Sequence, residues 1–273
     1  MNKCIIMFSN GLDSRLVIKI MQERGFEVTA IYNKYPFSKN VEKEVKEFCK
    51  EQKVKLKIFD FTKDKLLQDY LKIIKKPIYG RGNALNPCID CRILGLQVAK
   101  KFADKNKIKF IVTGEVLGQR PMSQHKKAMK IVEEKSGLKN RLLRPLTEIG
   151  IHGRRRTEQM ALAKKFKINY PFPAGGCLLC EKEYCKKLKN ILHKKLSSKD
   201  IKLLKIGRHF ENSEIILGKD KKENEILEKE KGWKVIPKQP GATALIKYKK
   251  HLKKAKELIK KYSKHDVREF DVR

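Results

Sequence analysis

Short apolar runs alternate with amphipathic stretches over the first 115 residues of the chain. Four apolar runs predict buried strands, at residues 4–8, 28–32, 54–59 and 108–112. Between them, apolar side chains recur at helical spacing and predict helices over residues 15–24, 41–52, 65–74 and 93–102. Regular alternation of strand and helix implies parallel strands joined by right-handed crossovers. We therefore expect an α/β fold with a doubly wound parallel sheet, whose ligands bind at the carboxyl ends of the strands.

The alternation ends near residue 170. A further strand is predicted at residues 142–146 and a helix at 157–166, before prolines and glycines interrupt the pattern at residues 170–176. Beyond them we expect a basic helix over 182–196, strands at 215–217 and 243–247, and a Lys-rich helix over 252–262. The predicted domains are therefore residues 1–180, a basic helical linker over 181–202, and a smaller carboxyl-terminal α+β domain over 203–273.

Positive charge dominates the composition. The 273 residues include 66 Lys and Arg against 31 Asp and Glu, a formal net charge of +35. Residues 201–273 hold 21 basic and 11 acidic side chains, so the excess is not confined to a tail. Such a surface favours nucleic acid as the partner, because counterion release drives that binding; an anionic membrane surface or an ordinary solvated Lys-rich surface are the alternatives. No apolar run approaches the roughly 20 residues that span a bilayer, so we expect a cytoplasmic protein without a membrane segment.

Residues 9–14, with the sequence SNGLDS, lie between the first predicted strand and the first predicted helix. Gly11 lets the backbone approach an anion closely, Asn10 tolerates a left-handed turn, and a helix amino terminus favours phosphate. Asp13 offers the carboxylate that Mg²⁺ prefers. The pattern indicates a phosphate-binding loop. The alternative is a polar turn in which Asp13 or Ser14 caps the helix.

Cysteine spacing points to a thiol site. Cytosolic thiols stay reduced, so structural disulfides are not expected. Cys88 and Cys91 form a C-x-x-C pair ahead of a predicted helix, whose amides favour thiolates. Cys177 follows in a Gly-Gly-Cys turn, and Cys180 lies three residues further on. Thiolates suit zinc or an iron-sulfur cluster, and the spacing does not choose between them.

Two segments carry a resemblance to a known family. Residues 9–14 resemble the S-G-G-x-D-S loop of PP-loop ATP pyrophosphatases, which cleave ATP between the α and β phosphates and adenylate a carbonyl oxygen. Residues 113–119 (TGEVLGQ), followed by residues 122–124 (MSQ), resemble the G-E-x-L-G-Q segment of ThiI-type tRNA 4-thiouridine synthases, and residues 144–146 (RPL) also fit that family. The resemblance covers residues 1 to about 180 and implies a HUP-like PP-loop fold. It implies that ATP is bound by Ser9, Asn10, Gly11, Leu12, Asp13, Ser14, Gly114, Glu115 and Gln119.

The sequence departs from that family at identifiable places. Asn10 stands where the second position of the loop is commonly glycine. The family's amino-terminal tRNA-binding module and the rhodanese domain of many bacterial members have no counterpart in the sequence. We therefore expect RNA docking and sulfur delivery to be solved differently.

The cysteines resemble those of iron-sulfur tRNA thiolases of the same superfamily. That resemblance implies a 4Fe-4S cluster held by Cys88, Cys91 and Cys177, with one open iron for the hydrosulfide. A four-ligand zinc or iron-sulfur site that includes Cys180, and thiol or persulfide chemistry without metal, stay open. The function expected is ATP- and Mg²⁺-dependent thiolation of a tRNA uridine, with sulfide or a donor protein as sulfur source and Asp13 and the three cysteines as catalytic residues. A PP-loop amidating or ligating enzyme with structural zinc, and a non-catalytic RNA-binding protein with a degenerate loop, are the alternatives.

Basic residues outside the loop predict the RNA contacts. Arg154, Arg155 and Arg156 precede a predicted helix and are placed to clamp phosphates, with a solvated helix start as the alternative. Residues 203–250 resemble the RNA-binding domain of NFACT proteins, which implies RNA contacts by Arg208 and Lys219 and a turn at Gly218 and Asn224 close to a backbone phosphate. Phe210, Trp233 and Tyr248 are candidates for base stacking, with packing in the core as the alternative.

Overall fold

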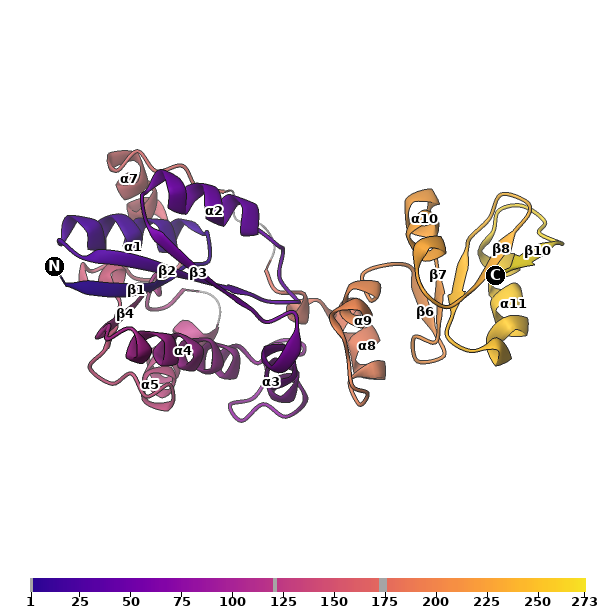
Figure 1. Cartoon of the computed structure of the whole chain (residues 1–273), viewed down its shortest axis with the longest axis horizontal. Coiled ribbons are helices and arrows are strands. Elements are labelled where there is room, and N and C mark those ends of the chain that lie inside the picture. Colours follow the sequence, from indigo (N-terminus) through magenta and orange to yellow (C-terminus); the bar gives the residue numbers. More distant parts are fainter. Residues whose placement is uncertain (1, 120–121, 172–175) are drawn as a thin grey trace. The chain divides into compact units, whose positions relative to one another are not determined.

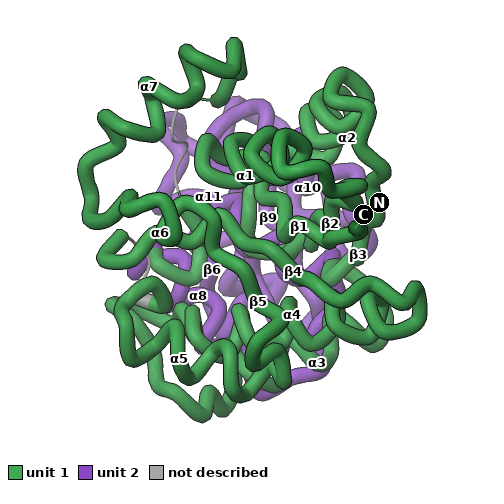
Figure 2. Tube along the Cα trace, turned by 90° about the vertical axis from the view of Figure 1, so that its left-hand side faces the viewer, with its two compact units in different colours: residues 1–180 green, residues 181–273 purple. Residues whose placement is uncertain are grey.

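The chain divides into two units, residues 1–180 and 181–273, coloured separately in Figure 2. The structure is a computed structural model that describes residues 2–119, 122–171 and 176–273. Residues 172–175, within the predicted proline- and glycine-rich break, therefore lie outside the described residues. Residues 181–202, predicted as a linker, are helical over much of their length and belong to the second unit.

Five parallel strands form the centre of the first unit. They are β1 (Lys3–Met7), β2 (Glu27–Lys34), β3 (Lys55–Asp60), β4 (Phe110–Thr113) and β5 (Leu142–Leu143), in the spatial order β3-β2-β1-β4-β5. Cys4 pairs with Val28 on one side and Phe110 on the other, so β1 is central. The chain builds outward from β1 in one direction and then returns to its other side. The predicted doubly wound parallel sheet is confirmed.

Helices cover both faces of this sheet, as Figure 1 shows. One face carries α1 (Leu12–Glu23), α2 (Glu42–Glu51), α6 (Pro145–Glu148) and α7 (Thr157–Lys165), and the other carries α4 (Cys88–Lys105) and α5 (Lys126–Lys135). The remaining elements are α3 (Asp64–Lys75), which packs beside α4, and the 3-10 turns η1 (Met122–Gln124) and η2 (Leu178–Cys180). Alternate residues of β1 serve the two faces, because Ile6 packs in the first core and Ile5 in the second.

Two elements differ from the predicted bounds in ways that affect the site. The helix predicted from residue 93 begins at Cys88, so the C-x-x-C pair lies inside its first turn and not before it. Asp90 in that turn is buried and accepts hydrogen bonds from the amides of Ile78 (2.8 Å) and Tyr79 (3.1 Å). The strand predicted at residues 142–146 ends at Leu143, because Pro145 begins α6 in the first helical position that proline favours.

The second unit is an antiparallel sheet with helices. Its strands are β6 (Arg208–Phe210), β7 (Ile215–Leu217), β8 (Trp233–Pro237), β9 (Ala244–Ile246) and β10 (Phe270–Val272), in the order β10-β8-β9-β7-β6. Its helices are α8 (Lys182–Ile191), α9 (Ser198–Leu203), α10 (Lys221–Lys229), η3 (Lys249–His251) and α11 (Leu252–Tyr262). Ile215 and Ile259 belong to the main core, while Leu227 of α10 packs with Ile216 on the other face. The predicted smaller α+β domain is confirmed.

Within the described ranges, no helix is both long and apolar enough to cross a membrane.

Candidate functional site

The switch point of the sheet brings the two predicted nucleotide segments together. β1 and β4 are neighbours, so the loops that follow them leave from the same edge of the sheet. A Cβ placed on Gly114 would lie 2.8 Å from the carbonyl carbon of Asp13 and 2.9 Å from the amide nitrogen of Ser14. Only glycine allows the chain after β4 to approach the phosphate loop this closely. Gly114 therefore sets the distance between the two segments.

Asn10 makes the left-handed turn of the phosphate loop. Its φ is 68°, in the region that glycine usually occupies, and the residue is buried. The predicted left-handed turn at Asn10 is confirmed, and Gly11 has an extended conformation with φ −77°. Asparagine can adopt this left-handed conformation in place of glycine, because local hydrogen bonds to its side-chain amide stabilise it.

Arg15 supplies those hydrogen bonds. Its Nη2 donates to the side-chain Oδ1 of Asn10 at 2.7 Å and its Nε donates to the Asn10 carbonyl at 3.2 Å. Its Nη1 donates to the carbonyl of Asn169, and the guanidinium stacks over the Phe48 ring at 4.2 Å. Arg15 is buried, and burial lowers its pKa. Sequence reasoning missed Arg15, because its partner Asn169 lies 154 residues away.

The two serines close the loop. The hydroxyl of Ser14 donates to the carbonyl of Gly11 at 2.9 Å and accepts from the amide of Ser9 at 3.3 Å. Ser9 also donates its hydroxyl to that of Ser14 at 3.3 Å. Leu12 points into the core, so it can offer a ligand only its backbone. The loop is therefore held in shape by its own side chains.

Unpartnered polar atoms gather beside the loop. The Oδ1 atom of Asp13 is shielded from solvent and has no well-formed hydrogen bond among the described residues. The amide of Gln159 in α7 lies close enough to act on the Asp13 carboxyl, although neither of its polar atoms makes a well-formed hydrogen bond. In the segment after β4, Nε2 of Gln119 is also buried without a partner among the described residues. Burial raises the pKa of Asp13, and the neighbouring Arg156 guanidinium and Gln159 amide oppose that shift. Buried polar groups are normally hydrogen-bonded, so this group is suited to a polar ligand or a cation. Gln159 of α7 was not predicted.

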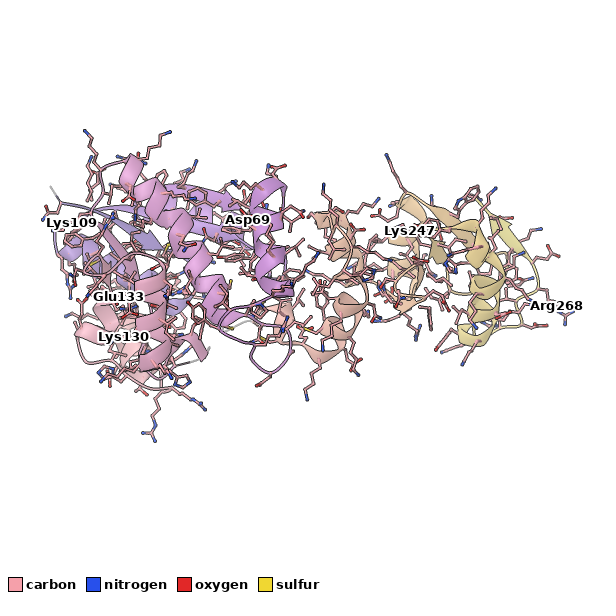
Figure 3. All side chains as sticks on the ribbon, turned by 90° about the horizontal axis from the view of Figure 1, so that it is seen from below. Asp69, Lys109, Lys130, Glu133, Lys247 and Arg268 are labelled. Atoms are coloured by element: carbon pink, nitrogen blue, oxygen red, sulfur yellow. The ribbon has the colours of Figure 1, made fainter. Side chains whose placement is uncertain are left out.

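Glu115 is engaged by protein cations. Its Oε1 accepts from Nε of Arg92 at 2.8 Å, and its Oε2 accepts from Nε of Arg144 at 3.1 Å and from the Thr113 hydroxyl at 3.1 Å. Arg144 also donates to Glu133 of α5 at 2.6 Å, a residue labelled in Figure 3. Burial acts to raise the pKa of Glu115, but the two guanidinium groups hold it below its ordinary value.

The ion pairs with Arg92 and Arg144 leave no free oxygen on the Glu115 carboxylate. Both carboxylate oxygens are taken by protein donors, and the backbone carbonyl accepts from the Thr147 hydroxyl at 3.0 Å. The side chain therefore orients Arg92 and Arg144 and is not free for a nucleotide. Arg92 directly follows Cys91 in α4. Glu115 thus connects the end of β4 to the helix that carries the C-x-x-C pair.

Cys177 lies in the electrostatic environment of the other three clustered cysteines of the first unit. Burial raises the pKa of Cys177 to about 12, and the thiols of Cys91, Cys180 and Cys88 contribute to that environment. Backbone bonds support the arrangement, because Leu85 donates to Leu179 at 3.0 Å and so ties the approach to α4 to η2. Within the described residues, however, no three Cys, His, Asp or Glu side chains are positioned to hold a metal ion.

The helix terminus does not make Cys91 a thiolate. Its Sγ lies 3.6 Å from the Tyr70 hydroxyl, and burial raises its pKa to about 11. Burial therefore disfavours the thiolate of Cys91, against the expectation drawn from its place at the helix start. Cys4 and Cys49 are buried in the core of the first unit, and Cys185 is buried in α8.

The predicted RNA-contacting residues fall in two places. Arg154, Arg155 and Arg156 are exposed just before α7, with Arg156 close enough to Asp13 to affect its pKa. Arg208 and Lys219 belong to the second unit, where the Arg208 guanidinium lies over the Tyr262 ring at 4.8 Å and the exposed Lys219 follows β7.

The Asn224 side chain beside Gly218 is engaged within the second unit, and the phosphate contact expected of this turn stays a prediction. The Asn224 side chain accepts from the amide of Thr243 and donates to the carbonyl of Gly241, each at 3.0 Å. A Cβ on Gly218 would collide with that side chain. Gly218 and Asn224 therefore join α10 to the loop between β8 and β9.

Comparisons with known proteins concern mainly the first unit. The family described as "Thiamine biosynthesis protein (ThiI)" matches residues 1–168. A "Probable tRNA sulfurtransferase" of Thermoanaerobacter sp. (strain X514) is 32% identical over 124 residues, covering 43% of this chain and 30% of that protein. A protein of the same name from Finegoldia magna is 31% identical over 144 residues, covering 52% of this chain and 35% of its own. The chain thus spans 30% to 35% of the length of these relatives.

Two solved structures were also compared with the chain. A 4-thiouridine synthetase in complex with RNA and bound ATP gives a TM-score of 0.47 at 20% identity, over 74% of this chain and 52% of that one. A predicted subunit of a tRNA methyltransferase from Methanocaldococcus jannaschii gives 0.42 at 17% identity, over 60% of this chain and 76% of that one.

Proposed function

Because the chain belongs to the ThiI family, we propose that it is an ATP-dependent tRNA sulfurtransferase that thiolates a uridine. The main support for the proposal is that Oδ1 of Asp13 is buried without a well-formed hydrogen bond, beside the phosphate loop at the switch point of the sheet. Relatives named probable tRNA sulfurtransferase support the reaction type. The Asn10–Arg15 contact supports a functional loop over a degenerate one, because it supplies the turn that the missing glycine would make.

The proposed reaction has two steps. First, the carbonyl oxygen at C4 or C2 of a uridine attacks the α phosphorus of ATP, and pyrophosphate leaves as the bond to the bridging oxygen breaks. Second, a sulfur nucleophile adds to the activated ring carbon, and AMP leaves with the former carbonyl oxygen. Adenylation is required because the carbonyl oxygen is otherwise a poor leaving group.

Several residues of the site contribute to the adenylation step. The amides of the phosphate loop and the dipole of α1 stabilise the charge on the departing pyrophosphate. Asp13 is the residue that would hold Mg²⁺, which neutralises phosphate charge when it is bound. Arg156 lies beside Asp13 and adds positive charge at the same point. Gly114 keeps the chain after β4 against the loop, so that the backbone up to Gln119 lines the nucleotide.

The cysteine group is the proposed site at which sulfur is delivered to the activated uridine. Its thiols suit soft metals, and Cys88, Cys91 and Cys177 would hold a 4Fe-4S cluster, with Cys180 as a fourth ligand in the alternative zinc or iron-sulfur site. Such a cluster would supply a binding position for hydrosulfide, which would come from sulfide or from a donor protein. The raised pKa values of Cys91 and Cys177 mean that binding would release protons from both thiols.

The second unit is the proposed docking module for tRNA. It carries much of the positive charge, including the 21 basic against 11 acidic residues over 201–273. We also propose a cytoplasmic location, where tRNA and ATP are available.

Exchange between pyrophosphate and ATP tests the adenylation step. The protein is incubated with ATP, Mg²⁺, tRNA and radiolabelled pyrophosphate, without a sulfur source. We expect label to enter ATP only when tRNA is present, because adenylated uridine accumulates and reverts. Hydrolysis of ATP to ADP and phosphate, or the absence of exchange with every tRNA pool, would contradict the proposal.

A further inference from the structure

Two large aromatic side chains are exposed together on the second unit. Trp233 is 36% exposed and Tyr248 is 45% exposed. Trp233 begins β8 and pairs with Ile246, the last residue of β9, and Tyr248 lies two positions beyond Ile246. Strand pairing therefore places both rings at the same end of the β8–β9 ladder. Core packing, which was the alternative for these residues, does not account for rings that remain exposed to this extent.

Three lysines surround these rings. The Nζ of Lys249 lies 4.1 Å from the centre of the Trp233 ring, and those of Lys247 and Lys250 each lie 5.4 Å from the centre of the Tyr248 ring. Lys247, which directly follows β9, is labelled in Figure 3. All three are exposed, and among the described residues none of them is in a salt bridge. We call these five residues, Trp233, Lys247, Tyr248, Lys249 and Lys250, the aromatic-lysine patch.

The acidic group under the patch is already occupied. Glu214 accepts from Lys194 at 3.3 Å and interacts with His251 Nε2 at 2.9 Å. The contact with His251 lowers the pKa of Glu214, and burial opposes that shift. The nearby lysines also lower it, so the pKa lies below its ordinary value. The Glu214 carboxylate therefore interacts with Lys194, His251 and, through its charge, Lys250. Lys247 and Lys249 have no acidic partner among the described salt bridges, so their positive charge remains available to an anionic partner.

We propose that the aromatic-lysine patch binds unpaired bases of RNA, with Trp233 and Tyr248 stacking on the bases and the lysines contacting the adjoining phosphates. Every base offers a π face, so stacking is tolerant of sequence, while a duplex hides its bases from such a surface. Flexible ammonium groups close to both rings suit contacts with the phosphates that flank a stacked base. The inference rests on the proposed function, since it identifies where and how the second unit would hold the unpaired part of a tRNA.

Trp233 is the only tryptophan of the chain, so its fluorescence reports on the patch alone. The full-length protein is titrated with a single-stranded RNA oligonucleotide and with a duplex RNA of equal length. We expect the single strand to quench Trp233 emission and the duplex to bind more weakly with little quenching. Anisotropy of end-labelled RNA measures binding independently. Unchanged Trp233 emission at a single-strand concentration that saturates anisotropy would overturn the proposal, because RNA would then bind elsewhere.

Substitutions separate stacking from charge. We expect Trp233→Ala to weaken single-strand binding about tenfold, which is within the range for loss of one stacked base, and Trp233→Phe to retain most of the affinity. Circular dichroism verifies that both variants fold. The triple change Lys247→Gln, Lys249→Gln and Lys250→Gln should weaken binding more than the matched change Lys221→Gln, Lys222→Gln and Lys229→Gln, which removes equal charge from the exposed face of α10. Equal effects of the two triples, or wild-type affinity of a folded Trp233→Ala variant, would contradict the proposal.

The outcome is distinguishable from failure of the thiolation proposal. Quenching by single-stranded RNA without any thiolated product would leave the patch in place and remove the activity. Formation of thiolated product by a protein whose Trp233 emission does not change with RNA would support the activity and contradict RNA binding at the patch. A patch that fails the RNA tests would be reassigned to a protein partner.

Discussion

Asn10 and Arg15 form a buried pair inside the phosphate loop, in which the guanidinium Nη2 donates to the asparagine Oδ1 at 2.7 Å. The same guanidinium also binds the Asn10 carbonyl, and the contact fixes a left-handed residue with φ 68°. Arg15 extends the connection to the carbonyl of Asn169, in the segment after α7. The loop conformation therefore depends on a side-chain pair, where the related S-G-G-x-D-S loops have a glycine.

The first prediction concerns this pair. Asn10→Ala should lower the free energy of unfolding of the first unit by about 2 kcal/mol, because alanine disfavours positive φ and the buried guanidinium loses a partner. Asn10→Gly should lower it by only about 1 kcal/mol, since glycine restores the backbone conformation. Urea unfolding followed by circular dichroism measures both. Equal stability of Asn10→Ala and wild type would show that the pair does not hold the loop.

The second prediction concerns Gly114. A Cβ at this position would lie within 3.0 Å of the backbone of Asp13 and Ser14, so Gly114→Ala should displace the loop and weaken ATP binding at least tenfold. Gly176→Ala is the matched control, because a Cβ there meets nothing within 4 Å. Calorimetric titration with ATP and Mg²⁺ measures the affinities. Wild-type affinity of Gly114→Ala would mean that the two segments do not bind the nucleotide together.

The third prediction concerns the buried Glu115. Glu115→Gln should destabilise the first unit by about 3 kcal/mol at pH 7, because removing one partner leaves buried guanidinium charge uncompensated. The folded-state pKa of Glu115 is held below its ordinary value of 4.5, so its stabilising contribution is fully present above pH 4.5 and is lost as the pH falls through the folded-state pKa. The stability difference between wild type and variant should therefore shrink in acid. A difference that is independent of pH would contradict this account.

The fourth prediction concerns metal content. Protein purified without oxygen should be brown and contain about four iron and four acid-labile sulfide per chain. Cys88→Ser, Cys91→Ser and Cys177→Ser should each lose the iron, whereas Cys180→Ser should keep it. Iron assays and absorption spectra measure this. Stoichiometric zinc without acid-labile sulfide would contradict the iron-sulfur cluster and indicate a zinc site. Loss of iron in Cys180→Ser would indicate four protein ligands.

The sequence was sufficient for elements whose pattern is local. The Lys-rich helix predicted at 252–262 spans Leu252–Tyr262, and the apolar run at 4–8 becomes β1 at Lys3–Met7. The strands β6, β8 and β10 were not predicted. β6 and β10 have only three residues each, in which apolar and polar side chains are mixed, and their partners lie elsewhere in the chain. Pairing that depends on distant segments leaves little periodic signal in so short a strand.

The sequence predicted the segments that form the site but not all of the side chains that hold it in shape. The predicted fold places the phosphate loop and residues 113–119 together at the switch point, and the structure confirms that they meet there. Nucleotide binding by the two segments stays a prediction. The roles of Arg15 and Gln159 were not predicted, because an arginine or glutamine in an amphipathic helix is usually solvated. Their burial follows only from packing between α1, α7 and the sheet.

The central claim is that Asp13 and the phosphate loop activate a tRNA uridine for sulfur transfer. Mass spectrometry of nucleosides from tRNA incubated with protein, ATP, Mg²⁺ and sulfide measures the product directly. Wild type should form a thiolated uridine only with ATP, and Asp13→Ala should form it at least about 10² to 10³ times more slowly, the scale for one preorganised electrostatic contact, with iron content and RNA affinity retained. Absence of any thiolated nucleoside from wild type that still binds RNA, or wild-type rates from Asp13→Ala, would contradict the claim.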